Sequence, residues 1–314
     1  MTAILRICER SLRPDLSKTI LAGALSAMIG SAVAGPVIID GTDANDHGSF
    51  NGTVNLNGWE YMQRALENIG SQVAPAVTKV VVDLGTSAGQ ARNAINSAFG
   101  QSNLVAAGWT LTHVDGVTDI TNWLTNLSTA NTGILYLPTY GNAGGDLTAT
   151  EMAAINANAN AINNFVSGAG NPATGGGLFS MGESGTGAYG WLTALIPGIV
   201  ATDVGGGGIG TDITLTADGI TAFPGLTNID LAGADPWHGY FSGNLGGLSV
   251  LGTAPQGGVT RNVILGGGAG TVIGCGLPGQ PPCQNPVPEP GSLALLGIGL
   301  VAAFAGRRRM ATRV

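Results

Sequence analysis

The sequence predicts an α/β fold in which a parallel sheet carries helices on both faces. Short apolar runs typical of buried strands recur five times between residues 37 and 181. Segments with helical periodicity separate these runs. Such alternation predicts parallel pairing, because each helix returns the chain to the same end of the sheet. Residues 35–265 hold this pattern and are numerous enough for one domain.

The first part of the pattern comprises two strands and two helices. Residues 37–39 (VII) are the first predicted strand, and KVVVDL at 79–84 is the second. A helix is expected between them, because apolar residues recur there at a spacing that places them on one helical face: Trp59, Met62, Leu66 and Ile69. A second helix is expected near residues 88–99.

Three further strands of the sheet are predicted at 110–114, 133–138 and 177–181. A helix is expected at 117–127. The next helix begins after Thr148, which can cap it, and Glu151 three residues later would complete a capping box. Its apolar stripe continues to Val166, and a short helix follows around 189–195. Later strands that extend or cap the sheet are expected at 212–216, 247–252 and 261–265.

This order of elements resembles the class I glutamine amidotransferase-like superfamily over about residues 36–252. The features that carry the resemblance are three glycines leading into the fifth strand and a long loop to Asp-Pro-Trp-His at 235–238. The resemblance implies a flavodoxin- or amidotransferase-like sheet, with a nucleophile after the fifth strand at Ser180. Class I amidotransferases need Cys there, and the domain has none, so glutamine hydrolysis is not expected.

Ser180 has two interpretations. As the nucleophile of a serine hydrolase it would use His238 as a base, oriented by Asp235 or Glu183. However, the G-x-S-x-G pattern of a nucleophile elbow is broken, because Leu178 stands where the first glycine belongs. The sequence favours the other interpretation, in which Ser180 only hydrogen-bonds at the end of a strand.

Polar residues also follow the first strand. The sequence from Asp43 to Gly48 (DANDHG) begins like a calcium loop, but position twelve is Val54 instead of Glu, which rules out an EF-hand. A looser Ca²⁺ site with Asp43, Asn45 and Asp46 as ligands is one interpretation. The other is a turn in which carboxylates cap backbone amides. We expect no other cofactor.

Aromatic residues flank one of the histidines. His238 lies beside Trp237 and Tyr240, which would form either a sugar-stacking patch or an anchor of the loop in the core. His113 falls within the third strand, where we expect a core or face residue and no ligand.

The N-terminus, residues 1–34, predicts a signal peptide. Arg6, Arg10, Arg13 and Lys18 form a basic region, an apolar stretch covers 19–33, and the small residues 32–34 form a cleavage site. Twin arginines are missing, so we expect the general secretion route and removal by signal peptidase.

Charge excludes one class of partner. Between residues 35 and 289 four basic side chains stand against 17 acidic ones, a net charge of −13. Nucleic acid is therefore not an expected partner. Divalent cations and neutral glycans are compatible with this negative charge as partners. The acidic residues can also serve only to keep the exported protein soluble.

A Gly/Pro-rich stretch at 266–286 is expected to be a stalk. It contains Cys275 and Cys283, an even pair that we expect to form a disulfide in an oxidising compartment.

The C-terminus, residues 287–309, has three parts in order. Val287-Pro288-Glu289-Pro290 comes first, an apolar segment at 292–306 second, and Arg307-Arg308-Arg309 last. As a helix the segment would span about 22 Å, short of a hydrocarbon core of about 30 Å. This order resembles the PEP-CTERM sorting signal. The resemblance implies a protein held briefly in the inner membrane by that helix and passed on by an exosortase. The alternative is a permanent tail anchor.

Together these features predict an exported protein of the cell surface or of an extracellular polysaccharide matrix. We expect a non-catalytic binding or structural role, with exosortase, signal peptidase, the inner membrane and polysaccharide as partners. The alternative is the serine hydrolase that would use Ser180 and His238.

Overall fold

The computed structural model describes residues 35–141, 144–169, 175–182, 188–204, 208–231 and 237–267. The predicted signal peptide, the two cysteines of the stalk and the sorting tail lie outside these residues. The stalk was predicted to begin at residue 266, which is wrong by two residues, because Gly266 and Gly267 still pair with the first strand of the sheet. In the part that is described, no helix is long and apolar enough to cross a membrane. The helix predicted at 292–306 lies outside that part.

Five parallel strands form the centre of the sheet, as predicted. They are β1 (Val37–Asp40), β4 (Val80–Leu84), β5 (Thr110–Val114), β6 (Ile134–Leu137) and β7 (Gly177–Ser180), in the spatial order β5-β4-β6-β7-β1. In the flavodoxin order the first strand lies between the second and third. Here β1 instead pairs with β7 on one side.

The other side of β1 continues as an antiparallel extension. β12 (Val259–Gly267) pairs with β1, followed by β10 (Gly239–Gly243) and β8 (Ile199–Asp203). β11 (Ser249–Gln256) pairs with β12 and with β9 (Thr214–Leu215). The predicted late strands thus extend the sheet. β8 and β10 were not predicted. GYFSG in β10 carries no apolar run, and the apolar part of β8 is only Ile-Val-Ala. A small hairpin of β2 (Gly48–Phe50) and β3 (Asn55–Asn57) was not predicted either.

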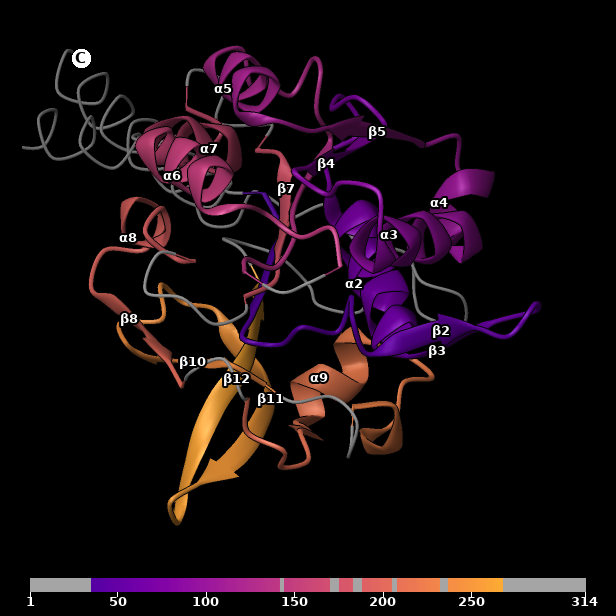
Figure 1. Ribbon diagram of the computed structural model, residues 1–314, viewed down its shortest axis with the longest axis vertical. Helices are drawn as coiled ribbons and strands as arrows, with labels where there is room; N and C mark the ends of the chain where they lie inside the picture. Colours follow the sequence, from indigo (N-terminus) through magenta and orange to yellow (C-terminus); the bar gives the residue numbers. More distant parts are fainter. Residues whose placement is uncertain are drawn as a thin grey trace, which may run out of the picture. The chain divides into compact units, whose positions relative to one another are not determined.

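Helices cover both faces of the parallel strands (Figure 1). α2 (Gly58–Gln72) and α3 (Gln90–Gln101) pack on one face, with α4 (Asn103–Ala106) beside them. α5 (Val117–Thr125), α6 (Ala149–Ala157), α7 (Ala159–Ser167) and α8 (Leu192–Leu195) pack on the other. α9 (Ala217–Ala222) and a 3₁₀ turn (Asn228–Leu231) lie against α2.

The two cores follow the alternation of side chains along each strand. Ile38 and Phe179 face α2, whereas Ile39 and Leu178 face α6 and α7. Because successive strand residues point to opposite faces, each central strand supplies both cores and must be apolar throughout.

The predicted capping box at the start of α6 is present. Thr148 Oγ1 accepts from the Glu151 backbone amide, and the Glu151 carboxylate accepts from the Thr148 amide at 2.8 Å. The single helix expected beyond it is two helices, α6 and α7, divided at Asn158. The Asn158 side chain donates to the carbonyl of Ala154 at 2.8 Å, a local bond of the kind by which Asn competes with helical pairing.

Candidate functional site

The loops after β1 and β6 meet at the carboxyl ends of the parallel strands. Asn45, in the first loop, donates from Nδ2 to Thr139 Oγ1 at 2.8 Å and to Asp146 Oδ1 at 2.7 Å, both in the second loop. The predicted residues Asp43, Asn45 and Asp46 are thereby brought together with Asp146, which the sequence analysis missed. We call Asp43, Asp46 and Asp146 the carboxylate cluster.

Two histidines hold the innermost carboxylate of this cluster. Asp43 Oδ2 lies 3.1 Å from His238 Nε2 and 3.1 Å from His47 Nε2. Burial raises the pKa of Asp43, but the hydrogen bonds from His238 and His47 outweigh burial and leave that pKa below its usual value. Its other oxygen, Oδ1, is buried and has no hydrogen-bond partner among the described residues.

The pKa values of the other two carboxylates in the cluster are shifted in the opposite direction, upward. Burial and the nearby charge of Asp146 raise the pKa of Asp46 to about 7. Burial also raises the pKa of Asp146, although hydrogen bonds with the side chains of Thr139, Asn45 and Asp46 oppose the rise. Asp146 Oδ2 is buried without a hydrogen-bond partner in the described part of the chain. The cluster therefore needs positive charge, either a proton or a cation.

The cluster is not arranged as a closed metal cage. Within the described ranges, no group of three or more His, Cys, Asp or Glu side chains could hold a metal ion by itself. Any cation would need neutral oxygens or water as additional ligands, a mixture that Ca²⁺ accepts readily. The cation site stays a prediction.

Asp40, at the end of β1, fixes the start of the first loop. It is fully buried and accepts from the Thr42 amide at 2.9 Å, from Thr42 Oγ1 at 2.8 Å and from Tyr61 Oη at 2.7 Å. Its carbonyl accepts from Tyr189 Oη at 2.6 Å. Burial raises the pKa of Asp40 to about 7, against the effect of these hydrogen bonds.

Ser180 and His238 have different hydrogen-bonding surroundings. Ser180 is buried at the end of β7, in register with Ile39 of β1. The backbone amide of His238 donates to the Gly41 carbonyl at 2.6 Å, and its ring meets Asp43. No hydrogen bond among the described residues joins Ser180 to His238. Glu183 and Asp235 lie outside the described residues. The serine hydrolase therefore stays a prediction.

We expect a fluorophosphonate probe to leave the protein unlabelled. Such probes need an accessible serine activated by a base, whereas Ser180 is buried and makes no hydrogen bond with His238 among the described residues. The measurement is labelling of the wild type beside Ser180→Ala, with a known serine hydrolase as positive control. Labelling that disappears in Ser180→Ala would establish the hydrolase.

The aromatic pair beside His238 anchors the loop. Trp237 is completely buried and donates from Nε1 to Thr211 Oγ1 at 2.9 Å. Tyr240 packs edge-on against it, with ring centroids 6.3 Å apart, and lies under the Arg261 guanidinium. A sugar-stacking patch at Trp237 is therefore wrong, because no ligand can reach the ring.

A second polar group lies between β4 and β5. Asp83 is buried, and its Oδ2 lies 2.6 Å from His113 Nδ1 and 3.4 Å from Arg92 Nε. His113 Nε2 lies 3.0 Å from Asn96 Oδ1. His113 is a partly exposed face residue, in agreement with the prediction. Its partner was missed, although an Asp inside the apolar run VVVDL is a signal that could have found it.

Comparison with known families identifies the C-terminal segment. Residues 286–309 match the PEP-CTERM protein-sorting motif. The motif thus indicates an exported protein that is targeted to an exosortase. The PEP-CTERM motif implies a cell-surface or extracellular destination, and its match includes Val287 to Pro290 and all three arginines at 307–309. No curated protein and no solved structure matched the chain, so the amidotransferase-like resemblance is not confirmed.

Proposed function

We propose that this exosortase substrate is a non-catalytic component of the cell surface or extracellular matrix and that its carboxylate cluster binds Ca²⁺. The observation that carries the proposal is the pair of buried carboxylate oxygens, Asp43 Oδ1 and Asp146 Oδ2, that no described group satisfies. Signal peptidase would remove residues 1–34, and the C-terminal helix would hold the protein in the inner membrane until sorting.

Burying an acceptor without a partner costs about 1–3 kcal/mol, and more when it is charged. Asp43 and Asp146 are 1% and 7% exposed, so water reaches neither residue freely. A cation between them would remove this cost and would also offset the repulsion that raises the pKa of Asp46.

The chemistry of the donors favours a hard cation. All three side chains of the cluster offer carboxylate oxygens, and Asn45 and Thr139 add neutral oxygens nearby. Ca²⁺ takes six to eight oxygen ligands in flexible geometry, including amide oxygens and water. Because the ligands come from the loops after β1 and β6, a bound ion would tie the two loops together.

Added Ca²⁺ should raise the melting temperature by about 5 °C or more at saturating concentration. Binding to the folded state alone contributes about 2.7 kcal/mol at a hundredfold excess over Kd. The measurement is a thermal melt of the full-length protein in detergent with CaCl₂ or EDTA. Asp146→Asn, which keeps size and hydrogen-bonding oxygen, should remove the shift. The control Asp218→Asn alters an exposed acid on α9 and should retain it.

Two results would contradict the proposal. One is a wild-type melting temperature that is the same in CaCl₂ and EDTA. The other is an equal shift in the wild type and in Asp146→Asn, because the ion would then bind elsewhere.

A further inference from the structure

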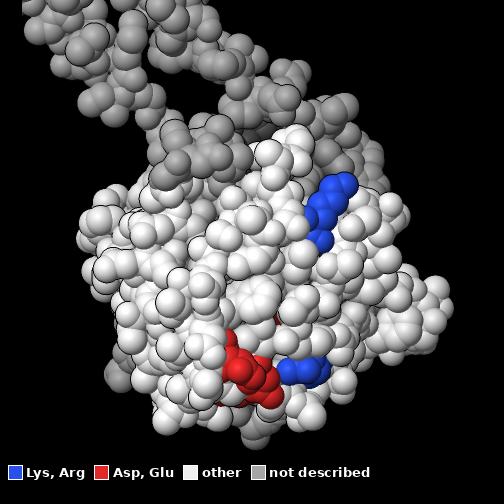
Figure 2. All heavy atoms as spheres, turned by 90° about the horizontal axis from the view of Figure 1, so that it is seen from above, with Lys and Arg blue, Asp and Glu red and all other residues white. Residues whose placement is uncertain are grey.

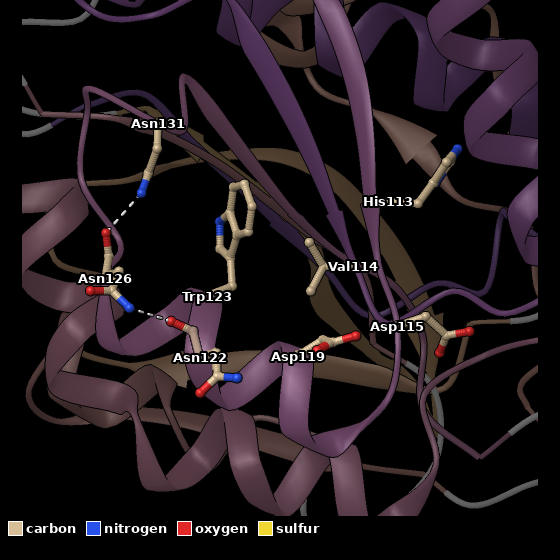
Figure 3. Close-up of a pocket in the computed structure, with 8 residues that line it drawn as sticks. All are labelled: His113, Val114, Asp115, Asp119, Asn122, Trp123, Asn126 and Asn131. Atoms are coloured by element: carbon tan, nitrogen blue, oxygen red, sulfur yellow. Dashed lines mark hydrogen bonds between the residues drawn. The ribbon is translucent and has the colours of Figure 1, made fainter.

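A hollow of about 430 Å³ lies between the edge strand β5 and helix α5, and it shares no residue with the carboxylate cluster (Figure 3). Its volume falls within the range of small-molecule sites, roughly 300–1,000 Å³. It is lined by His113, Val114, Asp115, Asp119, Asn122, Trp123, Asn126 and Asn131.

The indole of Trp123 stands in the middle of this hollow. Figure 3 shows it between the three asparagines on one side and Val114, Asp119 and Asp115 on the other. Its Nε1 donates to Thr132 Oγ1 at 3.1 Å, which fixes the ring. A fixed, partly exposed indole offers a flat apolar surface at little cost in conformational entropy.

Two of the asparagine side chains that line the hollow are also held in place by hydrogen bonds. Asn131 Nδ2 donates to the carbonyl of Asn126 at 2.8 Å, and Asn126 Nδ2 donates to the carbonyl of Asn122 at 2.9 Å. The side chains of Asn122 and Asp119 are exposed on α5 and make no hydrogen bond with any described residue. One amide and one carboxylate, a donor and an acceptor, are thus available beside the ring.

We propose that this hollow binds a neutral glycan. A sugar hydroxyl is both donor and acceptor, so it can use an Asn amide and an Asp carboxylate together, while the apolar face of the sugar ring packs on Trp123. An acidic sugar would be repelled by Asp119. Asp115 also presents a carboxylate to the hollow, with Arg92 Nη2 at 4.0 Å from it. A cationic ligand would use the carboxylates but not the amide donors of Asn122.

The surroundings agree with an uncharged ligand. The face of the molecule that is uppermost in Figure 1, where α5 lies, is mostly uncharged where it is described, with one small acidic area beside a basic side chain and a second basic side chain apart from it (Figure 2). Among the described residues in this view, the basic side chains stand apart and form no cluster that would hold a phosphate or a uronate (Figure 2).

The test is native affinity electrophoresis of the full-length protein in detergent, in gels that contain dextran, mannan, galactan or the anionic polygalacturonate. We expect at least one neutral polysaccharide to retard the wild type, and polygalacturonate not to. The double variant Asp119→Ala/Asn122→Ala should weaken the retardation at least tenfold in apparent Kd. Both positions are exposed on a helix, where Ala is well tolerated, so folding should persist.

A matched control is Asp218→Ala, which removes an exposed acid from the first turn of α9 just as Asp119→Ala does from α5. It should bind like the wild type. Trp123→Ala should abolish retardation. Because the ring also packs on the core, the circular dichroism of this variant is compared with that of the wild type to show that it is folded.

Several outcomes would overturn the glycan site: no retardation by any neutral polysaccharide, retardation by polygalacturonate alone, or equal retardation of the double variant. Performing the gels in EDTA separates this result from Ca²⁺ binding, so either proposal can fail without the other.

Discussion

Gly41→Ala should lower the free energy of unfolding by about 3 kcal/mol or more. Gly41 follows β1, and its carbonyl accepts from the amides of His238 at 2.6 Å and Gly239 at 3.0 Å. A Cβ atom at position 41 would overlap the backbone carbonyl of Gly239. Because the obstacle is backbone, the strain cannot be relieved by rotating a side chain, and His238 would have to move away from Asp43.

The matched control is Gly100→Ala. Gly100 lies in α3, and a Cβ there meets nothing within 4 Å, so alanine should stabilise the helix by about 0.5–1 kcal/mol. Urea unfolding followed by circular dichroism measures both. A loss below about 1 kcal/mol in Gly41→Ala would show that the 237–239 segment does not approach β1 as described.

The stability of the protein should fall as pH rises from about 4 to about 7, and Asp40 should be a main cause. In the unfolded chain its carboxyl titrates near pH 3.8, whereas burial raises the pKa in the folded protein to about 7. Within this window the folded state binds more protons, so each rise in pH lowers the free energy of unfolding. The contribution of Asp40 is at most about 4 kcal/mol, and it is constant outside the window.

Asp40→Asn should remove this share of the pH dependence. The amide keeps the shape and an oxygen acceptor for Thr42 but carries no charge at any pH. Asp46 has a pKa raised to about 7 as well, so a smaller slope should persist in the variant. The measurement is urea unfolding in EDTA at pH 5, 6, 7 and 8, with Asp218→Asn, which alters an exposed acid on α9, as the control. Parallel curves for Asp40→Asn and the wild type would contradict a buried neutral Asp40.

Some features could be predicted because their signals are local. The five central strands are short apolar runs between helical patterns, and each was found within a few residues of its place. Thr148 and Glu151 are three residues apart, so their capping box could be predicted directly. The break at Asn158 is also local, but the apolar stripe on both sides of it suggested one continuous helix.

The composition of the candidate site was only partly predictable. Asp43, Asn45 and Asp46 share one loop and therefore stood out together. Asp146 lies 101 residues from Asn45, its hydrogen-bond partner, and Asp43 lies 195 residues from His238. No periodic pattern in the sequence indicates such a contact, because the contact depends on the spatial order of the strands.

The sequence by itself determined the route and the building blocks of this protein: the PEP-CTERM motif at residues 286–309, the alternating strands and helices, and the acidic character of the exported part. Only the tertiary structure decided that β1 lies beside β7 and β12, that Asp146 and His238 reach the loop after β1, and that Trp123 stands beside the edge strand β5. The physical reason is the separation along the sequence between the residues that interact. Motifs and periodicity express forces between near neighbours in the chain, whereas these contacts arise when apolar faces far apart in sequence are buried against one another.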